Sequence, residues 1–586
     1  MYYSNGNYEA FARPRKLEGV EQKSAYIVGS GLAGLAAACF LVRDAQMPGS
    51  NIHIFEADPI AGGALDGAFI EEYGYLCRGG REMESHMECL WDLFRSIPSL
   101  EERDYSVLDE FYWLNKEDPN ISLERDIYPG GKSATDSANG FSPRVSEQLQ
   151  KIMMTPERFL EDKKITDFFN DEFFNTPYWL HWSTMFAFQK WHSALEFKLY
   201  NQRFIHYSNI EGGLAGFRGM KFMRYNQYES FVMPLQKYLE ANNVDFIFST
   251  TVTDIIFDCS TGKKVAEQIV ILRNGKEEKI DLTENDYVFT TLGSNVDKSS
   301  IGKHNTPPAI DFTPGAGRSW ELWKKIAAQN PSFGRPEKFC GNIHDTLFAS
   351  ATVTIDDKIG EYVENICKRP LAGGKTVTGG IISVKNSKWM MSFTFDRQPH
   401  FASQPEGKYV GWLYALNNYV PGDYIKKPMM ECTGLEICEE WLYLMGVPED
   451  QIVDLATNHA NVVPCVMPYV TTYFMPRAAG DRPKVVPDGA VNFAFLGEHV
   501  ETPRDVVFTT EYAVRTGMEA VYTLLGVDRG VPEVYGSYYD IRHLLPMLKD
   551  GVNNFPIKLP APIKDQLMKK IKNTDIEDVL KEYGLM

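Results

Sequence analysis

One short stretch, "VGSGLAG" at residues 28–34, constrains the fold more than any other part of this 586-residue chain. It carries Gly29, Gly31 and Gly34 in GxGxxG spacing, between the apolar run "SAYI" and the alanine-rich run "LAAACFLVRDA". In this pattern the first glycine permits a tight turn, the second admits a pyrophosphate, and the third lets a helix pack closely on a strand. The stretch therefore predicts a strand, a dinucleotide-binding turn and a helix whose N-terminus faces phosphates.

An acidic residue follows at the spacing that such a site needs. Glu56 ends the next apolar run, 22 residues after Gly34 (56 − 34 = 22), where an acid commonly accepts a hydrogen bond from a ribose hydroxyl. "IAGGALDG" then places Gly63 in a second glycine loop, which is typical of FAD-binding chains. Later segments that read as strands and turns are expected to return to the cofactor, and they carry Val252, Ser294, Glu498 and Thr509. Each could instead be an ordinary strand–turn–helix.

Alternating strands and helices predict an α/β fold with a Rossmann-like, three-layer FAD/NAD(P)-binding domain. We expect this domain to be discontinuous and to consist of residues 1–100, 235–300 and 488–545. The aromatic, helical and mixed stretches at 101–234 and 301–487 are expected to form substrate-binding lobes of α+β character. Residues 546–586 are expected to form a separate helical tail.

Composition excludes several classes of function. The chain has 60 Lys and Arg against 78 Asp and Glu, a net charge of −18, which argues against bulk nucleic-acid binding. The 11 histidines show no HExxH pattern or close Cys/His spacing, so no metal site is expected. The start has no signal peptide, no run approaches a membrane span, and nine cysteines form no CxxC pair. We therefore expect a cytoplasmic protein with reduced thiols.

The C-terminal tail has the pattern of a basic amphipathic helix. Its apolar face would carry Ile563, Leu567, Met568 and Ile571, and its other side would carry Lys564, Lys569, Lys570 and Lys572. On an acidic protein this pattern fits peripheral docking on the anionic inner face of a membrane. A helix packed on a partner subunit or on the core remains the alternative.

Several long strings carry a resemblance to a known family. They are "YSNGNYEAFARP", "RGGREMESHMECLWDLFRSIPSLE", "TMFAFQKWHSALEFKLYNQRFIH", "DYIKKPMMECTGLEICEEWLYLMGVPE" and "VPCVMPYVTTYFMPR". Over nearly its whole length the chain resembles the fatty acid double-bond hydratases (oleate hydratases, once called myosin-cross-reactive antigens). The resemblance implies an FAD-dependent lyase that adds water to the cis-9 double bond of oleate or linoleate. The product would be a 10-hydroxy acid, formed without net redox change, and we expect a homodimer.

The resemblance also implies roles for particular residues. Glu82 in "RGGREM" would activate water, and Tyr200 in "EFKLYNQRF" would protonate the alkene. A free phenol has a pKa near 10, so the site must stabilise the positive charge that develops on the substrate. Without the resemblance, Glu82 would be interpreted as a residue that complements a helix dipole, and Tyr200 as a core aromatic.

The remaining assignments concern the flavin and the lipid. The loop residues expected at the flavin are Arg78, Gly80, Arg81 and Met83. The resemblance points to Gln227, His459 and Asn461 as anchors for the substrate carboxylate. The expected tunnel wall includes Phe186, Phe188 and Trp191, which are equally good core residues. Two other classes of protein stay open. One is a redox flavoenzyme, such as an oxidase or isomerase acting on fatty acids or amines. The other is a surface antigen or coiled-coil protein without catalysis.

Overall fold

The computed structural model describes residues 8–120, 124–134, 140–209, 219–260 and 262–540, and a few isolated positions beyond them. The apolar face predicted for the C-terminal tail lies outside the described residues. The chain divides into two compact units. One comprises Met1–Thr135 and Met220–Val534, and the other comprises Asp136–Gly219 and Tyr535–Met586. The expected lobe at 101–234 is thus shared between the units, whereas 301–487 lies within the first.

The first unit contains a five-stranded parallel sheet in the order β18-β11-β1-β2-β7. Its strands are β1 (Ser24–Val28), β2 (Ile52–Phe55), β7 (Asp245–Ile247), β11 (Asp286–Thr291) and β18 (Phe493–Leu496). The chain leaves β1 toward β2 on one side and later returns to β11 on the other, so the strand order reverses at β1. Ligands of doubly wound sheets bind at the carboxyl ends of the strands at such a reversal.

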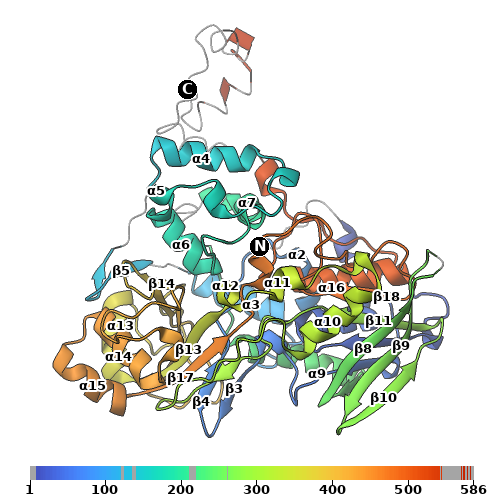
Figure 1. Ribbon diagram of the computed structural model, residues 1–586, viewed down its shortest axis with the longest axis horizontal. Coiled ribbons are helices and arrows are strands. Elements are labelled where there is room, and N and C mark those ends of the chain that lie inside the picture. Colours follow the sequence, from blue (N-terminus) through green and yellow to red (C-terminus); the bar gives the residue numbers. More distant parts are fainter. Residues whose placement is uncertain are drawn as a thin grey trace. The chain divides into compact units, whose positions relative to one another are not determined.

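Two helices from distant parts of the sequence pack together beside this sheet. They are α1 (Leu32–Arg43), buried along most of its length, and α16 (Thr510–Leu525), the long helix next to β11 and β18 in Figure 1. At their contact, a Cβ on Gly517 would lie 3.0 Å from the Ala33 carbonyl oxygen. The parallel sheet and its buried helices confirm the predicted α/β, Rossmann-like architecture.

A three-stranded antiparallel sheet joins the same unit. Its strands are β8 (Thr250–Asp258), β9 (Val265–Arg273) and β10 (Lys276–Asp281), and the helix α10 (Arg318–Gln329) packs against β8. The run "VDFIFSTTVTDIIFD" forms the two strands β7 and β8. Before α9 (Met233–Ala241), the turn Tyr228–Val232 is a π-helix.

The rest of the first unit is built on an eight-stranded mixed sheet in the order β12-β17-β13-β16-β15-β14-β5-β6. The strands are β5 (Asp126–Tyr128), β6 (Lys132–Ser133), β12 (Ser300–Ile301), β13 (Phe348–Asp356), β14 (Ile382–Val384), β15 (Met391–Thr394), β16 (Lys408–Ala415) and β17 (Ala460–Met467). The helices α13 (Asp357–Cys367), α14 (Gly434–Met445) and α15 (Glu449–Asn458) gather beside it (Figure 1). A hairpin of β3 (Gly67–Ile70) and β4 (Gly74–Cys77) carries the chain to the "RGGREM" loop and then to α2 (Glu88–Phe94).

The second unit is helical in its described part. Its main helices are α4 (Pro143–Met154), α5 (Asp171–Phe174), α6 (Pro177–Phe186) and α7 (Ala194–Arg203). The side chains of Ser142, Thr176 and Ser193 each accept a backbone N–H at a helix start, which explains where α4, α6 and α7 begin. Aromatic side chains fill the space between the helices.

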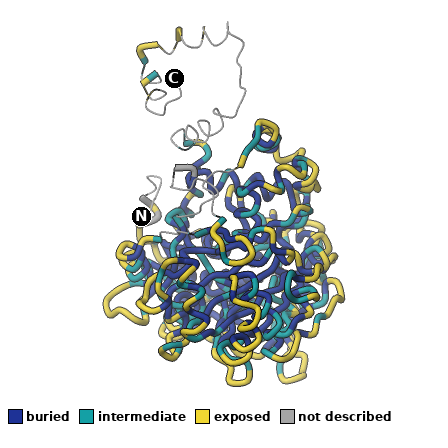
Figure 2. The backbone as a smooth tube through the Cα atoms, turned by 90° about the vertical axis from the view of Figure 1, so that its left-hand side faces the viewer, coloured by how far each residue is buried: buried dark blue, intermediate teal, exposed yellow. Residues whose placement is uncertain are grey.

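Buried residues form long continuous stretches of the chain, and many exposed residues lie where the tube turns at the surface, as Figure 2 shows. All nine cysteines fall in the described ranges and none forms a disulfide. Across the described residues, no helix is long and apolar enough to cross a membrane.

Candidate functional site

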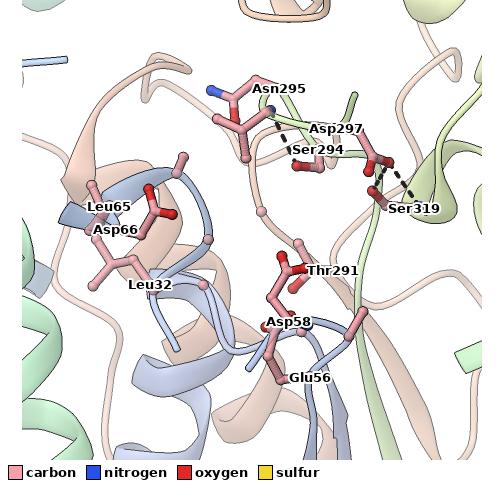
Figure 3. Close-up of a pocket in the computed structure, with 18 of the residues that line it drawn as sticks. Leu32, Glu56, Asp58, Leu65, Asp66, Thr291, Ser294, Asn295, Asp297 and Ser319 are labelled. Atoms are coloured by element: carbon pink, nitrogen blue, oxygen red, sulfur yellow. Dashed lines mark hydrogen bonds between the residues drawn. The ribbon is translucent and has the colours of Figure 1, made fainter. Parts of the chain in front are cut away.

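A cavity of about 580 Å³ opens at the carboxyl ends of β1, β2 and β11. Figure 3 shows Glu56 and Asp58 at one side of it, Thr291 beside them, and Asp297 bonded to Ser319 farther along the wall. This is where the reversal of strand order predicts a ligand. The cavity lies wholly within the first unit.

The three glycines of the GxGxxG stretch occupy three different environments. Gly29 has a φ of +94°, which L side chains rarely adopt. A Cβ on Gly34 would lie 2.1 Å from the Gly29 carbonyl oxygen, so only glycine lets α1 approach β1 this closely. Around Gly31, in contrast, a Cβ would meet nothing within 4 Å, because this residue faces the open cavity. The space at Gly31 is therefore available to a ligand.

The carboxylate of Glu56 is fixed by its neighbours. Its Oε2 accepts hydrogen bonds from the Ser30 backbone N–H at 2.9 Å and from the Ser30 hydroxyl at 2.6 Å. Its Oε1 accepts the Asp58 N–H at 2.9 Å. Carboxylate oxygens can accept further bonds, so Glu56 remains able to bind a ribose hydroxyl from a position that the turn itself determines.

Most residues predicted to bind the cofactor line this one cavity. They are Gly29, Gly31, Glu56, Gly63, Arg78, Arg81, Val252, Ser294, Glu498 and Thr509. Gly34 lies beneath the turn, and Gly80 lies 3.6 Å from the Asp396 carboxylate, measured from an ideal Cβ. Met83 is fully buried, and its sulfur accepts the hydroxyl of Thr510, which lines the cavity, at 3.8 Å. Gly34, Gly80 and Met83 therefore do not line this cavity.

The structure adds polar residues that the sequence did not indicate. Asp297, Ser319, Arg318 and Thr291 all line the cavity. The Thr291 hydroxyl is buried and has no hydrogen-bond partner among the described residues, so it is available to a ligand. Together with the open space at Gly31 and the fixed carboxylate of Glu56, this orphaned hydroxyl fits a dinucleotide cofactor. In the described part of the chain, no group of three or more His, Cys, Asp and Glu side chains could hold a metal.

Two charged groups that line the cavity, Glu498 and Arg81, have shifted pKa values. Burial raises the pKa of Glu498 to about 8, although its carboxylate accepts the Phe508 N–H, which lowers the pKa. Burial also lowers the pKa of Arg81, whose guanidinium donates to the Ala64 carbonyl at 3.2 Å. Perturbed ionisable groups gather where a ligand is bound or transformed.

Glu82 follows Arg81 and sits in a different environment. Its Oε2 is buried and finds no hydrogen-bond partner in the part of the chain that the structure describes. Burial raises the pKa of Glu82 to about 8, the Arg125 guanidinium lowers it, and the Asp396 carboxylate raises it again. A carboxyl with a pKa near neutrality is suited to general acid–base chemistry.

A second, small cavity of about 10 Å³ lies beside the same loop. It is lined by Arg81, Met83, Phe222, Met223, Tyr225, Asn226, Gln227, Asp396 and His400. The Gln227 amide nitrogen is buried there without a partner among the described residues. Burial lowers the pKa of His400, against the raising effect of Asp396. Sequence reasoning missed Asp396 and His400, which are separated from the glycine motifs by more than 300 residues (396 − 63 = 333).

The other two predicted anchors lie elsewhere. His459 is bonded through Nδ1 to Asp356 at 2.8 Å and through Nε2 to Lys358 at 3.1 Å. The Asn461 amide donates to the Tyr73 carbonyl at 2.8 Å, at the tip of the β3–β4 hairpin. The structure therefore does not bring them to the cavity that Gln227 lines.

Tyr200 belongs to the second unit. It is fully buried on α7, and its ring lies 4.7 Å from that of Phe186, 5.1 Å from that of Phe188 and 5.8 Å from that of Phe204, measured between centroids. The predicted wall residues Phe186 and Phe188 thus surround the predicted proton donor.

Comparison with known proteins decides the family. The model of the MCRA family matches residues 22–522, which include both cavities and the "RGGREM" loop. The chain belongs to the MCRA family. This result confirms the resemblance on which the sequence assignments rest.

Two curated relatives place the chain more closely within the MCRA family. It is 50% identical, over 595 aligned residues and all of both chains, to "Oleate hydratase" of Streptococcus pyogenes serotype M49 (strain NZ131). It is 30% identical to "Linoleate hydratase" of Lactiplantibacillus plantarum, over 86% of this chain and 94% of the relative. Among solved structures, cyclohexylamine oxidase from Brevibacterium oxydans IH-35A aligns with 86% of this chain and 99% of its own, at 11% identity and a TM-score of 0.47.

Proposed function

We propose that this protein is an FAD-dependent fatty acid hydratase. It adds water across the cis-9 double bond of unsaturated fatty acids such as oleate and linoleate, giving 10-hydroxy acids. The observation that carries the proposal is the 50% identity, over the full length of both chains, to a curated oleate hydratase. The geometry supports it, because the loop of Glu82 runs between a dinucleotide-sized cavity and a second buried polar cavity.

FAD is the cofactor that we assign to the larger cavity. The turn at Gly29 and Gly31 would receive the pyrophosphate, Glu56 would bind the ribose, and the Thr291 hydroxyl would gain a partner. When bound, the flavin supplies an electron-rich face that stabilises positive charge developing on the substrate. The reaction transfers no net electrons, so the protein residues carry the proton movements.

Glu82 is the group that we assign to water activation. Its carboxylate takes one proton from water while the remaining hydroxide forms the new C–O bond. Its high pKa makes it a strong enough base for this step. Tyr200 gives the proton that forms the new C–H bond, an assignment that rests on the resemblance alone. Water and alkene are consumed one for one, and the enzyme resets when the proton on Glu82 is lost and the Tyr200 phenolate is reprotonated.

The carboxylate of the substrate needs a buried polar partner. We assign this role to Gln227, whose amide nitrogen is buried without a partner among the described residues and faces the small cavity that His400 also lines. The amide N–H groups can donate to a carboxylate without bringing a second charge into the cavity. We do not extend the assignment to His459 and Asn461, whose polar atoms are engaged by Asp356, Lys358 and Tyr73.

The proposal includes an assembly and a location. We infer a cytoplasmic homodimer whose basic C-terminal tail contacts the inner face of the membrane, where fatty acids partition. Light scattering of the purified protein measures the dimer. Flotation with anionic vesicles, using the full chain and a chain ending at Pro560, measures the contact. Equal flotation of the two chains would remove the tail from the proposal.

One experiment separates hydration from redox chemistry. Purified holoenzyme is incubated with oleate in deuterated water under nitrogen, without an electron acceptor, and products are analysed by mass spectrometry. Hydration gives a hydroxy acid with one carbon-bound deuterium. An oxidase gives no product under these conditions, or one that differs from oleate in oxidation level, and an isomerase gives an isomer of oleate without added water. Any of these results would overturn the proposal.

A further inference from the structure

The residues around Glu82 include a buried cation with no role so far. Arg125 stands immediately before β5 and is 3% exposed. Its guanidinium donates to the Ile381 carbonyl at 2.6 Å, and its own carbonyl accepts the Ser383 N–H at 2.9 Å. β5 pairs in parallel with β14 at Asp126 and Ser383, so the sheet holds the backbone of Arg125. The Ile381 carbonyl, just before β14, holds its guanidinium.

The turn before β14 brings Arg125 and Glu82 together. Gly379 and Gly380 have φ values of +64° and +132°, which let the chain turn sharply here. A Cβ on Gly380 would lie 3.3 Å from Nη1 of Arg125 and 3.7 Å from Oε1 of Glu82. The cation and the carboxylate therefore both lie beside the bare Cα of this glycine. A side chain at position 380 would press on the guanidinium and reach contact distance of the carboxylate.

We propose that Arg125 is a positioning residue for Glu82, and that Gly380 is glycine because a larger residue would displace the guanidinium from its place near the carboxylate. The inference rests on the proposed role of Glu82 as the group that activates water. Arg125 favours the charged, water-activating form of the carboxylate, which burial disfavours. Its rigid guanidinium keeps one orientation because the Ile381 carbonyl anchors it.

The electrostatic surroundings agree with this role. The charged groups that act on Glu82 are Arg125, which lowers its pKa, and Asp396, which raises it. Those that act on Arg125 are Glu82, Tyr414 and Asp126. Arg125 is thus the cation that opposes both burial and Asp396 at Glu82. Without Arg125, burial and the Asp396 carboxylate would both favour the protonated form of Glu82.

The test is a pair of measurements on Arg125→Met and Arg125→Lys holoenzymes. The first is the pH dependence of kcat/KM for oleate hydration. Removing an opposite charge at this range raises a carboxyl pKa by about one unit or more, so the acid limb of Arg125→Met should move up by about that amount. At a pH below the acid limb, an upward shift of about one unit lowers kcat/KM about tenfold. In Arg125→Lys the acid limb should lie between its positions in wild type and in Arg125→Met.

The second measurement does not require activity. Infrared difference spectra report the carbonyl stretch of a protonated carboxylic acid, and Glu82→Gln identifies the Glu82 band. In Arg125→Met this band should persist to a pH about one unit higher than in wild type. Gly380→Ala should shift it in the same direction. This measurement judges the inference even if the holoenzyme proves not to hydrate oleate, an outcome that would overturn only the proposed function.

The control is Arg369→Met, which removes a partly buried arginine of the same unit. Arg369 pairs with Asp118, which Arg397 also binds, so the protein should fold and keep the Glu82 titration unchanged. Thermal unfolding and cofactor content check each variant. A Glu82 band that titrates at the same pH in Arg125→Met and wild type would overturn the inference. An equal shift in Arg369→Met would do the same.

Discussion

The two polar sites of the first unit are built in opposite ways. In the cofactor cavity, the key carboxylates are held by hydrogen bonds that include backbone N–H groups: Ser30 holds Glu56, and Ser319 holds Asp297. Around Glu82, the key groups come from three other segments, with Arg125 before β5, Gly380 before β14 and Asp396 after β15. The first site depends on backbone geometry, whereas the second depends on charges that distant strands bring together.

This difference determines how each site should fail. A cavity shaped by close backbone contacts is lost when a single added carbon forces the backbone apart. A carboxyl tuned by surrounding charges keeps its place when a neighbour is changed, but it titrates at a different pH. The predictions below separate loss of structure from change of ionisation.

The largest effect is expected for Glu82→Gln. The amide is nearly the same size as the carboxyl but cannot take a proton from water. General acid–base groups contribute about 10²- to 10⁴-fold, so kcat for oleate hydration should fall by this factor. FAD content and the midpoint of thermal unfolding should match wild type, because Glu82 lies outside the cavity lining. Normal turnover with bound FAD would remove Glu82 from the mechanism.

The backbone-built site is tested by Gly34→Ala against Gly31→Ala. Alanine favours a helix over glycine by about 1 kcal/mol, yet at position 34 its Cβ would lie 2.1 Å from the Gly29 carbonyl oxygen. We expect Gly34→Ala to lower the free energy of unfolding of the apoprotein by about 1–3 kcal/mol. Gly31→Ala, with open space around it, should leave apoprotein stability unchanged and weaken FAD binding. Denaturant unfolding and FAD titration measure the two effects, and equal apoprotein stability in both variants would contradict this view.

The same contrast explains what could be predicted from the sequence. The GxGxxG turn, Glu56 and the glycine loop at Gly63 are local patterns with a fixed spacing, and they line the cavity as their chemistry requires. Local pattern also predicts β1 and α1, because each needs only its own residues to be recognised.

The surroundings of Glu82 could not be predicted in this way. Arg125 and Gly380 are 255 positions apart in the chain (380 − 125 = 255), and no spacing rule connects them. They meet because β5 and β14 are neighbours in the sheet, a pairing that no local pattern reveals. His400 and Gln227 line the same small cavity, and no local pattern connects these two residues either. The assignments of Glu82 and Tyr200 came from the family resemblance and not from the residues themselves.

A smaller effect, opposite in sign to that of Arg125→Met, is expected for Asp396→Asn. The Asp396 carboxylate raises the pKa of Glu82, so its neutral amide should let Glu82 lose its proton at a lower pH. The acid limb of kcat/KM should then move down, by about one pH unit or less. The double variant with Arg125→Met should fall between the two single variants. A limb that moves up in Asp396→Asn would show that Asp396 acts on Glu82 by other means than its charge.

The smallest effect is expected at the other site, for Ser30→Ala. The Ser30 hydroxyl is one of three donors that hold the Glu56 carboxylate, and the backbone N–H groups of Ser30 and Asp58 remain when it is removed. The loss of one such bond should cost about 1 kcal/mol, which raises the Kd for FAD about fivefold. Ser50→Ala, at an exposed serine that bonds only to Asn51 in the described structure, is the control and should leave the Kd unchanged. A loss of FAD as complete as that expected for Glu56→Ala would mean that a side chain, and not the backbone of the turn, positions this carboxylate, and the contrast between the two sites would no longer hold.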